Sequence, residues 1–375
     1  MRCITREERE WPMGRRARNG KVGVFRVRGK GICFCLCVVA LTLAVFTLFR
    51  FSCADAPGEK MEEDTLTPMD EDLIVVGVSQ IGSESVWRTE NTASIQEAFT
   101  KEKGYFLIFK NARQKQENQI KALRSFISQR VDYIVFSPVT ESGWDTVLQE
   151  AKEAGIPVIL IDRKVKTSDD SLYVAWVGSD FVNEGRMAGE ELERQLKKQR
   201  RQDDSIHIVV LQGTEGSTSS IGRSRGFASV AEQHKNWNIL EQVDAEFTTA
   251  KGKEEMERLL HKYERIDVLV SQNDDMTFGA LEAIREAGIS VGDKGDMIII
   301  SFDAVENALK LVEQGEITAD VECNPDQGLY VERIIQKLEN QEPVAKLYFV
   351  SETVFTKEDL KESAGSPEEK ENTKQ

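Results

Sequence analysis

The chain has 375 residues, enough for two medium-sized domains that each bury a core. Its formal net charge of -15 argues against recognition of nucleic acid through a basic face. Beyond residue 53 the only cysteine is Cys323, and His207, His234 and His261 have no ligand spacing. We therefore expect no framework disulfide, no metal site and no cofactor.

A basic stretch followed by an apolar run begins the chain. The apolar residues extend from Ile32 to Phe49 and are followed by small residues around Cys53. This order is typical of a secretory signal, but the run also approaches the length of a membrane-spanning helix. Three interpretations of residues 1–56 therefore remain: a cleaved signal, an uncleaved anchor, or a signal that is cleaved and lipidated at Cys53. An acidic tether is expected at 57–72, and the rest of the chain is expected outside the cytoplasm, periplasmic or on the cell surface.

Strands and helices alternate through the first half of the remaining chain. Strands are predicted at residues 73–78, 105–109, 133–136 and 156–161, with helices at 89–102, 116–129 and 141–154 between them. The fourth strand is a continuous apolar run that ends at Asp162 and Arg163. A run without polar alternation predicts a strand buried on both faces, as in a parallel sheet covered by helices.

A second series with the same order follows. Strands are predicted at 206–211, 239–243, 268–271 and 297–302, with helices at 221–234, 252–263 and 276–287. Both halves therefore predict α/β domains with a doubly wound parallel sheet.

Polar and aromatic residues follow the strand ends in both series. They are Gln80, Trp87, Arg88, Asn111, Ser137, Asp162, Arg163, Arg223, Phe247, Asn273 and Asp303. Ligands of open α/β sheets bind at the carboxyl ends of the strands. Two such edges facing each other would form a cleft whose carboxylates, amides, guanidinium groups and rings suit the hydroxyls and C–H face of a sugar.

Longer motifs point to a known family. The segments 78–85 (VSQIGSES), 114–122 (QKQENQIKA) and 272–276 (QNDDM) resemble the ribose/galactose type of periplasmic sugar-binding proteins that serve ABC importers. The first two resemble galactofuranose-binding proteins most closely. The resemblance covers residues 74 to about 356 and implies a type I periplasmic-binding-protein fold.

The resemblance also implies roles for individual residues. Asp162, Arg163, Arg223, Asn273 and Asp303 match positions that hold sugar hydroxyls. Phe247 and Trp87 match aromatic residues that cover the sugar ring. Ser137 stands where ribose binders have Asn, and Cys323 stands where they have Gln, whereas the neighbouring Glu322 matches the galactofuranose type.

The family topology implies three crossings between the domains, near residues 178–180, 323–325 and 350. The N-terminal lobe is then expected at 73–178 plus 324–350, and the C-terminal lobe at 180–323 plus 351–360. A polar tail is expected at 361–375. The three crossings would form a hinge, and a bound sugar would favour the closed state because it contacts both lobes.

Three other functions are compared with sugar capture for an ABC permease. A glycosidase is disfavoured because a neighbouring Arg generally favours the ionised form of a carboxyl group, whereas a general acid must be protonated. A repressor of the lactose type would need a DNA-binding helix-turn-helix in place of the export segment. The alternative that stays open is a membrane-anchored sugar sensor that presents its closed state to a kinase or chemoreceptor. In either role a monomer is expected.

Overall fold

The computed structural model describes residues 73–292 and 295–365. The predicted signal or anchor at 1–56, the tether at 57–72 and residues 366–375 of the predicted tail lie outside the described residues. No helix in the described part of the chain has both the length and the apolar character needed to cross a membrane.

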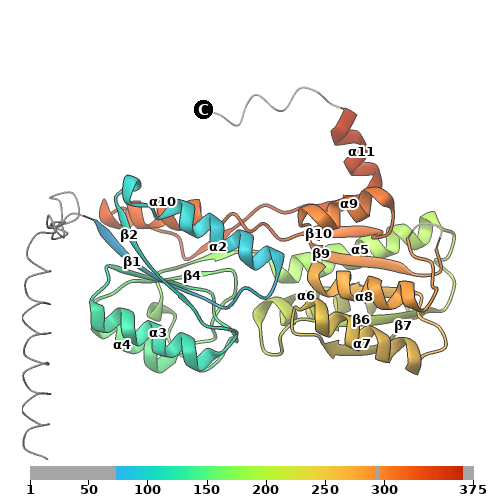
Figure 1. Ribbon diagram of the computed structural model, residues 1–375, viewed down its shortest axis with the longest axis horizontal. Coiled ribbons are helices and arrows are strands. Elements are labelled where there is room, and N and C mark those ends of the chain that lie inside the picture. The colour runs from blue at the N-terminus through green and yellow to red at the C-terminus, as the bar shows by residue number, and fades with distance from the viewer. Residues whose placement is uncertain (1–72, 293–294, 366–375) are drawn as a thin grey trace, which may run out of the picture. The chain divides into compact units, whose positions relative to one another are not determined.

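The first sheet contains six parallel strands in the order β11-β5-β4-β3-β1-β2 (Figure 1). They are β1 (Ile74–Gln80), β2 (Tyr105–Asn111), β3 (Tyr133–Phe136), β4 (Val158–Ile161), β5 (Ala175–Gly178) and β11 (Leu347–Phe349). The helices are α2 (Val86–Ala98), α3 (Gln116–Gln129), α4 (Asp145–Glu153) and α10 (Gly328–Glu339), with 3₁₀ turns at Lys101–Lys103 and Asp170–Leu172. We call this group the N-terminal lobe.

Strand β4 explains why the apolar run has no polar alternation. Ile159 and Ile161 belong to the core shared with α2 and α10, whereas Val158 and Leu160 belong to the core shared with α3 and α4. Successive side chains of a strand point to opposite faces, so a strand covered on both faces must be apolar at every position.

The second sheet has the order β12-β10-β9-β8-β6-β7, and β12 is its antiparallel strand. Its strands are β6 (Ile206–Gln212), β7 (Trp237–Asp244), β8 (Val268–Ser271), β9 (Ile298–Asp303), β10 (Ala319–Glu322) and β12 (Val354–Thr356). The helices are α5 (Phe181–Lys198), α6 (Thr218–Ala231), α7 (Thr249–Lys262), α8 (Asp274–Glu286), α9 (Glu306–Gln314) and α11 (Lys357–Gly365). We call this group the C-terminal lobe.

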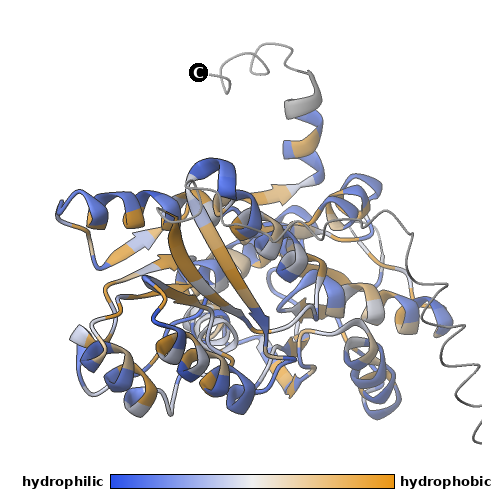
Figure 2. Ribbon diagram, turned by 60° about the vertical axis from the view of Figure 1, so that its left-hand side comes forward, coloured by the Kyte–Doolittle hydropathy of each residue, from blue (hydrophilic) through white to orange (hydrophobic). Residues whose placement is uncertain are grey.

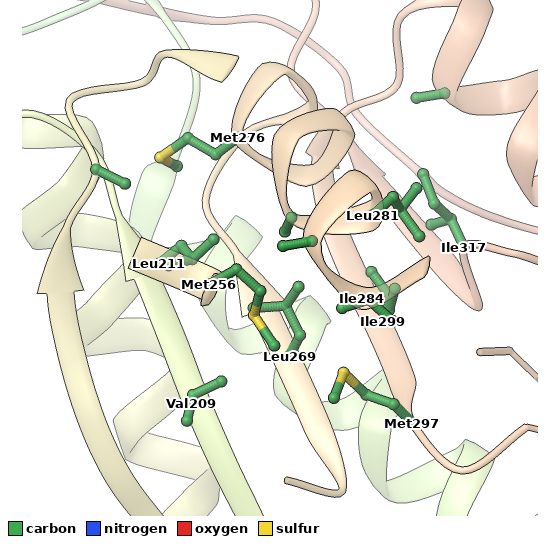
Figure 3. Close-up of a cluster of buried hydrophobic side chains, with 14 of the residues drawn as sticks. Val209, Leu211, Met256, Leu269, Met276, Leu281, Ile284, Met297, Ile299 and Ile317 are labelled. Carbon is green, nitrogen blue, oxygen red and sulfur yellow. The ribbon is translucent and has the colours of Figure 1, made fainter. Parts of the chain in front are cut away.

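The second sheet is also buried on both faces. Val209, Leu211 and Leu269 pack with Met256 and Met276 of α7 and α8 (Figure 3). The opposite face packs against α5 and α6. Figure 2 shows the hydropathy of these elements: the strands are mostly apolar, and the helices are apolar on one side and polar on the other. The prediction of two doubly wound α/β domains is confirmed.

The chain passes between the two sheets three times: between β5 and α5, between β10 and α10, and between β11 and β12. The short strands β5, β10, β11 and β12 were not predicted, and the exact lobe limits stay a prediction. Helix α11 reaches Gly365, inside the predicted tail 361–375. It starts there because Thr356 and Asp359 hydrogen bond each other reciprocally, as in a capping box.

Candidate functional site

A pocket lies between the carboxyl edges of the two sheets, and its cavity volume is about 20 Å³. A cavity of this volume has room for about one water molecule, so the side chains that line the pocket lie close together. Both lobes line it, through Glu84, Ser85, Trp87, Arg88, Asp162, Arg163, Phe181, Ser219, Arg223, Phe247, Asn273, Asp303 and Cys323.

Helix N-termini bring several of these residues to the pocket. Ser85 caps α2 by accepting a hydrogen bond from the backbone N–H of Arg88, at 3.1 Å. Asn273 caps α8 in the same way, through the N–H of Met276 at 2.9 Å. Both residues end a loop that follows a strand at the point where the strand order reverses, β1 in one sheet and β8 in the other. The caps therefore position side chains where open α/β sheets bind ligands.

Three pocket residues have a left-handed backbone, which is costly for residues other than glycine. The φ angles are 57° at Asp162, 59° at Phe247 and 109° at Asp303. Such conformations persist where the surrounding structure enforces them, and they concentrate at functional sites. The ring of Phe247 also lies so close to Gly213 that a Cβ there would be 1.8 Å from it. Gly213 is therefore required for the position of the ring.

The N-terminal side of the pocket is a buried network of charges. Arg88 lies 2.7 Å from Asp162 Oδ2 through Nη2 and 3.0 Å from Glu84 Oε1 through Nε. Ser137 donates to Asp162 Oδ2 at 2.9 Å, and Arg163 donates through Nη1 to the carbonyl of Val139 at 2.9 Å.

The two arginines of this network differ in pKa. Burial opposes the charge of Arg88, but the carboxylates of Asp162 and Glu84 outweigh it and raise its pKa. Burial, followed by the positive charge of Arg88, lowers the pKa of Arg163 to about 10. Both side chains therefore stay charged at neutral pH. Arg88 Nη1, Arg163 Nε and Glu84 Oε2 are buried and have no hydrogen-bond partner among residues 73–292 and 295–365, so this side has polar atoms available for a ligand.

The C-terminal side is organised around Arg223. Its Nε lies 2.6 Å from Glu184 Oε2, its Nη2 lies 3.2 Å from Asp303 Oδ1, and its Nη1 donates to the carbonyl of Gln272. Burial opposes the charge of Arg223, but Glu184 and Asp303 outweigh it and raise its pKa. Burial also raises the pKa of Asp303, although Arg223 lies beside it. All three guanidinium nitrogens are thus held by the protein.

Two aromatic rings complete the pocket. The Arg88 guanidinium lies 4.7 Å from the Trp87 ring centre, and the Arg163 guanidinium lies 5.1 Å from that of Phe247. The indole N–H of Trp87 donates to the carbonyl of Cys323, which holds the ring against the second crossing. Rings fixed in this way offer flat apolar faces next to hydrogen-bonding groups.

The lobes also contact each other directly outside the pocket. The backbone N–H of Glu141 donates to the carbonyl of Gly216 at 2.9 Å, and that of Lys164 donates to Thr218 Oγ1 at 3.0 Å. The N–H of Val86 donates to Asp275 Oδ2 at 2.9 Å. These contacts define a closed arrangement of the two lobes.

Most of the predicted site residues line this pocket, and four do not. Buried Gln80 donates to Asn91, and Ser137 donates to Asp162, so both lie behind the pocket. Exposed Asn111 accepts from the backbone of Arg113 in a separate surface hollow. Half-buried Glu322 accepts from the backbone of Thr353.

Five pocket residues were absent from the predicted set: Glu84, Ser85, Phe181, Ser219 and Cys323. Glu84 and Ser85 belong to the segment 78–85 that carries the family resemblance, so that signal was available. Phe181 and Ser219 sit in the first turns of α5 and α6. No local pattern separates such residues from ordinary first-turn residues.

The geometry is that of a two-lobed binding protein with a closed polar pocket, and comparison with known proteins supports the same conclusion. Residues 76–330 match the periplasmic binding protein domain, and the chain belongs to this family, which is one of solute-binding proteins and not of enzymes. The predicted family resemblance is thereby confirmed.

The chain is similar to several characterised proteins. It is 39% identical over 258 residues to the galactofuranose-binding protein YtfQ of Escherichia coli, covering 68% of this chain and 79% of that protein. A structure from Mycobacterium smegmatis in complex with β-D-fucofuranose is 40% identical, with a TM-score of 0.74 over 78% of this chain and 94% of the other. The binding protein of the arabinose ABC transporter from Shewanella sp. ANA-3, bound to α- and β-L-arabinofuranose, is 41% identical, with a TM-score of 0.72 over the same shares.

Proposed function

We propose that this protein captures a monosaccharide in its five-membered furanose form, in the pocket between the lobes, for import by an ABC permease. The observation that carries the proposal is the pocket itself. It is small, it has two fixed rings, and it holds three buried polar atoms, on Arg88, Arg163 and Glu84, that have no hydrogen-bond partner among the described residues. Hydroxyl groups both donate and accept, so a sugar can satisfy all three.

The choice of the furanose form rests on the relatives. The names of the similar proteins specify galactofuranose, fucofuranose and arabinofuranose, at 39 to 41% identity. Ribose and fructose import binding proteins are also similar, at 25 to 30% identity. Furanose-binding relatives are therefore the more similar ones.

Import is favoured over sensing because these relatives are import binding proteins or transporter components. The chain would then act as an exported monomer, retained at the membrane if the segment from Ile32 to Phe49 is not cleaved. The cross-cleft contacts supply the closed state that a permease would recognise. Co-purification with a permease, and not with a kinase or chemoreceptor, is the expected result.

Two glycosides that differ in ring size test the proposal. The full-length chain, purified in mild detergent, is titrated calorimetrically with methyl β-D-galactofuranoside and methyl β-D-galactopyranoside, and with free L-arabinose and D-galactose. We expect the furanoside to bind and the matched pyranoside not to bind. Equal binding of the two glycosides would remove the furanose claim, and absence of binding by all four sugars would remove the monosaccharide claim.

A further inference from the structure

The three chain crossings between the lobes meet at one buried point behind the ligand pocket. Ser179 lies on the first crossing, Cys323 on the second and Glu352 on the third. Ser179 Oγ lies 3.2 Å from Cys323 Sγ, and Ser179 also hydrogen bonds to Glu352. A movement of one crossing relative to the others would therefore change this cluster.

Glu184 of α5 connects this cluster to the pocket. Its side chain is 0% exposed, and its Oε2 accepts the 2.6 Å hydrogen bond from Arg223 Nε. Carboxylate oxygens of Glu184 and Glu352 and the sulfur of Cys323 lie within 4.8 Å of one another. Glu184 Oε1 and Glu352 Oε1 are both buried and have no hydrogen-bond donor among the described groups. Two carboxylates held this close with unpartnered oxygens repel each other unless a cation lies between them.

A proton fits this position better than a metal ion. The guanidinium of Arg223 already occupies one oxygen of Glu184, so a second fixed cation would face a positive charge. Burial raises the pKa of the Cys323 thiol, which opposes the thiolate form that metals need. A single shared proton converts one carboxylate into a donor to the other and leaves Arg223 in place.

The charges around the pair act in both directions. Burial, followed by the charge of Glu184, raises the pKa of Glu352 to about 9. The hydrogen bond from Ser179 and the charge of Arg223 on α6 act in the opposite direction and lower this pKa. Asp303 of β9 lies on the far side of Arg223, 3.2 Å from its Nη2, and burial raises the pKa of its carboxyl. Burial and the charge of Glu184 therefore outweigh the effect of Arg223 on Glu352, in agreement with the geometry.

We propose that Glu352 and Glu184 share one proton at the junction of the crossings, and that this proton positions Arg223 for the ligand and couples closure of the lobes to pH. The inference rests on the proposed sugar binding. When the lobes open, the third crossing moves relative to α5, and Glu352 gains water. The closed state then binds the proton more tightly than the open state. Closure, and with it affinity, is strongest at low pH and is lost as the pH rises through about 9.

The test compares the pH profiles of sugar affinity in two variants of the full-length chain. Glu352→Gln keeps the shape and the donor of the protonated acid but cannot titrate. Glu191→Gln is the matched control, because Glu191 lies two turns further along α5 and pairs with Arg194. The dissociation constant for L-arabinose is measured calorimetrically from about pH 6 to about pH 10. In the natural chain and the control it should rise with pH, by at most tenfold per unit for one proton. In Glu352→Gln it should stay flat up to about pH 9.

A second measurement observes the proton without any sugar. Infrared difference spectra across the same titration should show bands of protonated carboxylic acids, shifted in D₂O, and the spectrum of Glu352→Gln should lack the contribution of one acid that titrates near pH 9 in the natural chain. A stoichiometric metal ion that is lost in Glu352→Gln would overturn the shared proton. Sugar binding with the same pH slope in Glu352→Gln and the natural chain would overturn the coupling. Failure of all sugars to bind, with the infrared band present, would overturn the proposed function and leave the proton in place.

Discussion

The two sides of the pocket are built from the same kinds of residue but differ in how they are bonded. On the C-terminal side, all three nitrogens of Arg223 are held by Glu184, Asp303 and the carbonyl of Gln272. On the N-terminal side, Arg88, Arg163 and Glu84 each keep one buried polar atom that forms no hydrogen bond within the described part of the chain. The guanidinium group of the C-terminal side is therefore fully bonded without a ligand, whereas those of the N-terminal side are not.

This difference suggests a division of roles. Buried polar atoms without partners cost about 1 to 3 kcal/mol each, so a ligand that satisfies them binds selectively. The N-terminal side should therefore decide which sugar binds. The C-terminal side, fixed in advance and connected through Glu184 to the crossings, should decide whether the lobes stay closed.

Asp162→Ala should have the largest effect because it removes the carboxylate from Arg88 and leaves a buried charge without its main partner. Breaking a buried pair costs about 3 to 5 kcal/mol, so we expect both a clear drop in unfolding temperature and sugar binding weaker by more than about 100-fold. Asp169→Ala removes an exposed pair with Lys152 and should change stability by about 1 kcal/mol or less. For each variant, thermal unfolding measures the change in stability and calorimetric titration measures the change in sugar affinity. Equal effects of the two variants would contradict the buried network.

Gly213→Ala tests the C-terminal side through shape alone. The added methyl would meet the Phe247 ring at 1.8 Å, so the ring must move. Overpacking of this kind costs about 1 to 3 kcal/mol, and affinity should fall by about tenfold because the ring lines the pocket proposed for the ligand. The control is Ala228→Gly in the interior of α6, which should cost about 1 kcal/mol of stability without touching the pocket. Unchanged affinity in Gly213→Ala would remove Phe247 from the ligand site.

Asp320→Asn tests a second buried acid pair behind Asp303. Burial, with the charge of Asp303 added to it, raises the pKa of Asp320 to about 7, while its hydrogen bond with Asp274 acts in the opposite direction. A raised pKa in the folded state means that the stabilising effect is complete below about pH 4 and is lost as the pH rises through about 7. The variant should therefore unfold a few degrees higher than the natural chain at pH 8, with little difference at pH 4. An equal difference at both pH values would contradict the raised pKa of Asp320.

Ser137→Ala should have the smallest effect. It removes one hydrogen bond to Asp162, which keeps Arg88, so we expect a loss of about 1 kcal/mol, or about fivefold in affinity. Ser171→Ala is an exposed control that removes hydrogen bonds to Asp169. Calorimetric titration of both variants with L-arabinose separates them. A loss as large as that in Asp162→Ala would mean that Ser137 contacts the ligand itself.

Local sequence was informative for features that depend only on neighbouring residues, such as a buried strand or a helix cap. The run ending at Asp162 predicted a strand buried on both faces, and Asn273 stands before a helix that it caps. It was less informative for Asn111, which also ends a strand but faces a separate hollow. Strand ends of both kinds look alike in sequence because the neighbour across the sheet is distant in the chain.

The sequence by itself determined the longer strands of both sheets, and the resemblance of its motifs to a known family indicated most of the residues that line the pocket. The strands follow from side-chain periodicity and turn chemistry, which act over a few residues. Only the tertiary structure decided which polar atoms are left without partners, and that Ser179, Cys323 and Glu352 meet at Glu184. Those outcomes depend on burial and on distances between segments more than one hundred residues apart, and no local pattern encodes them.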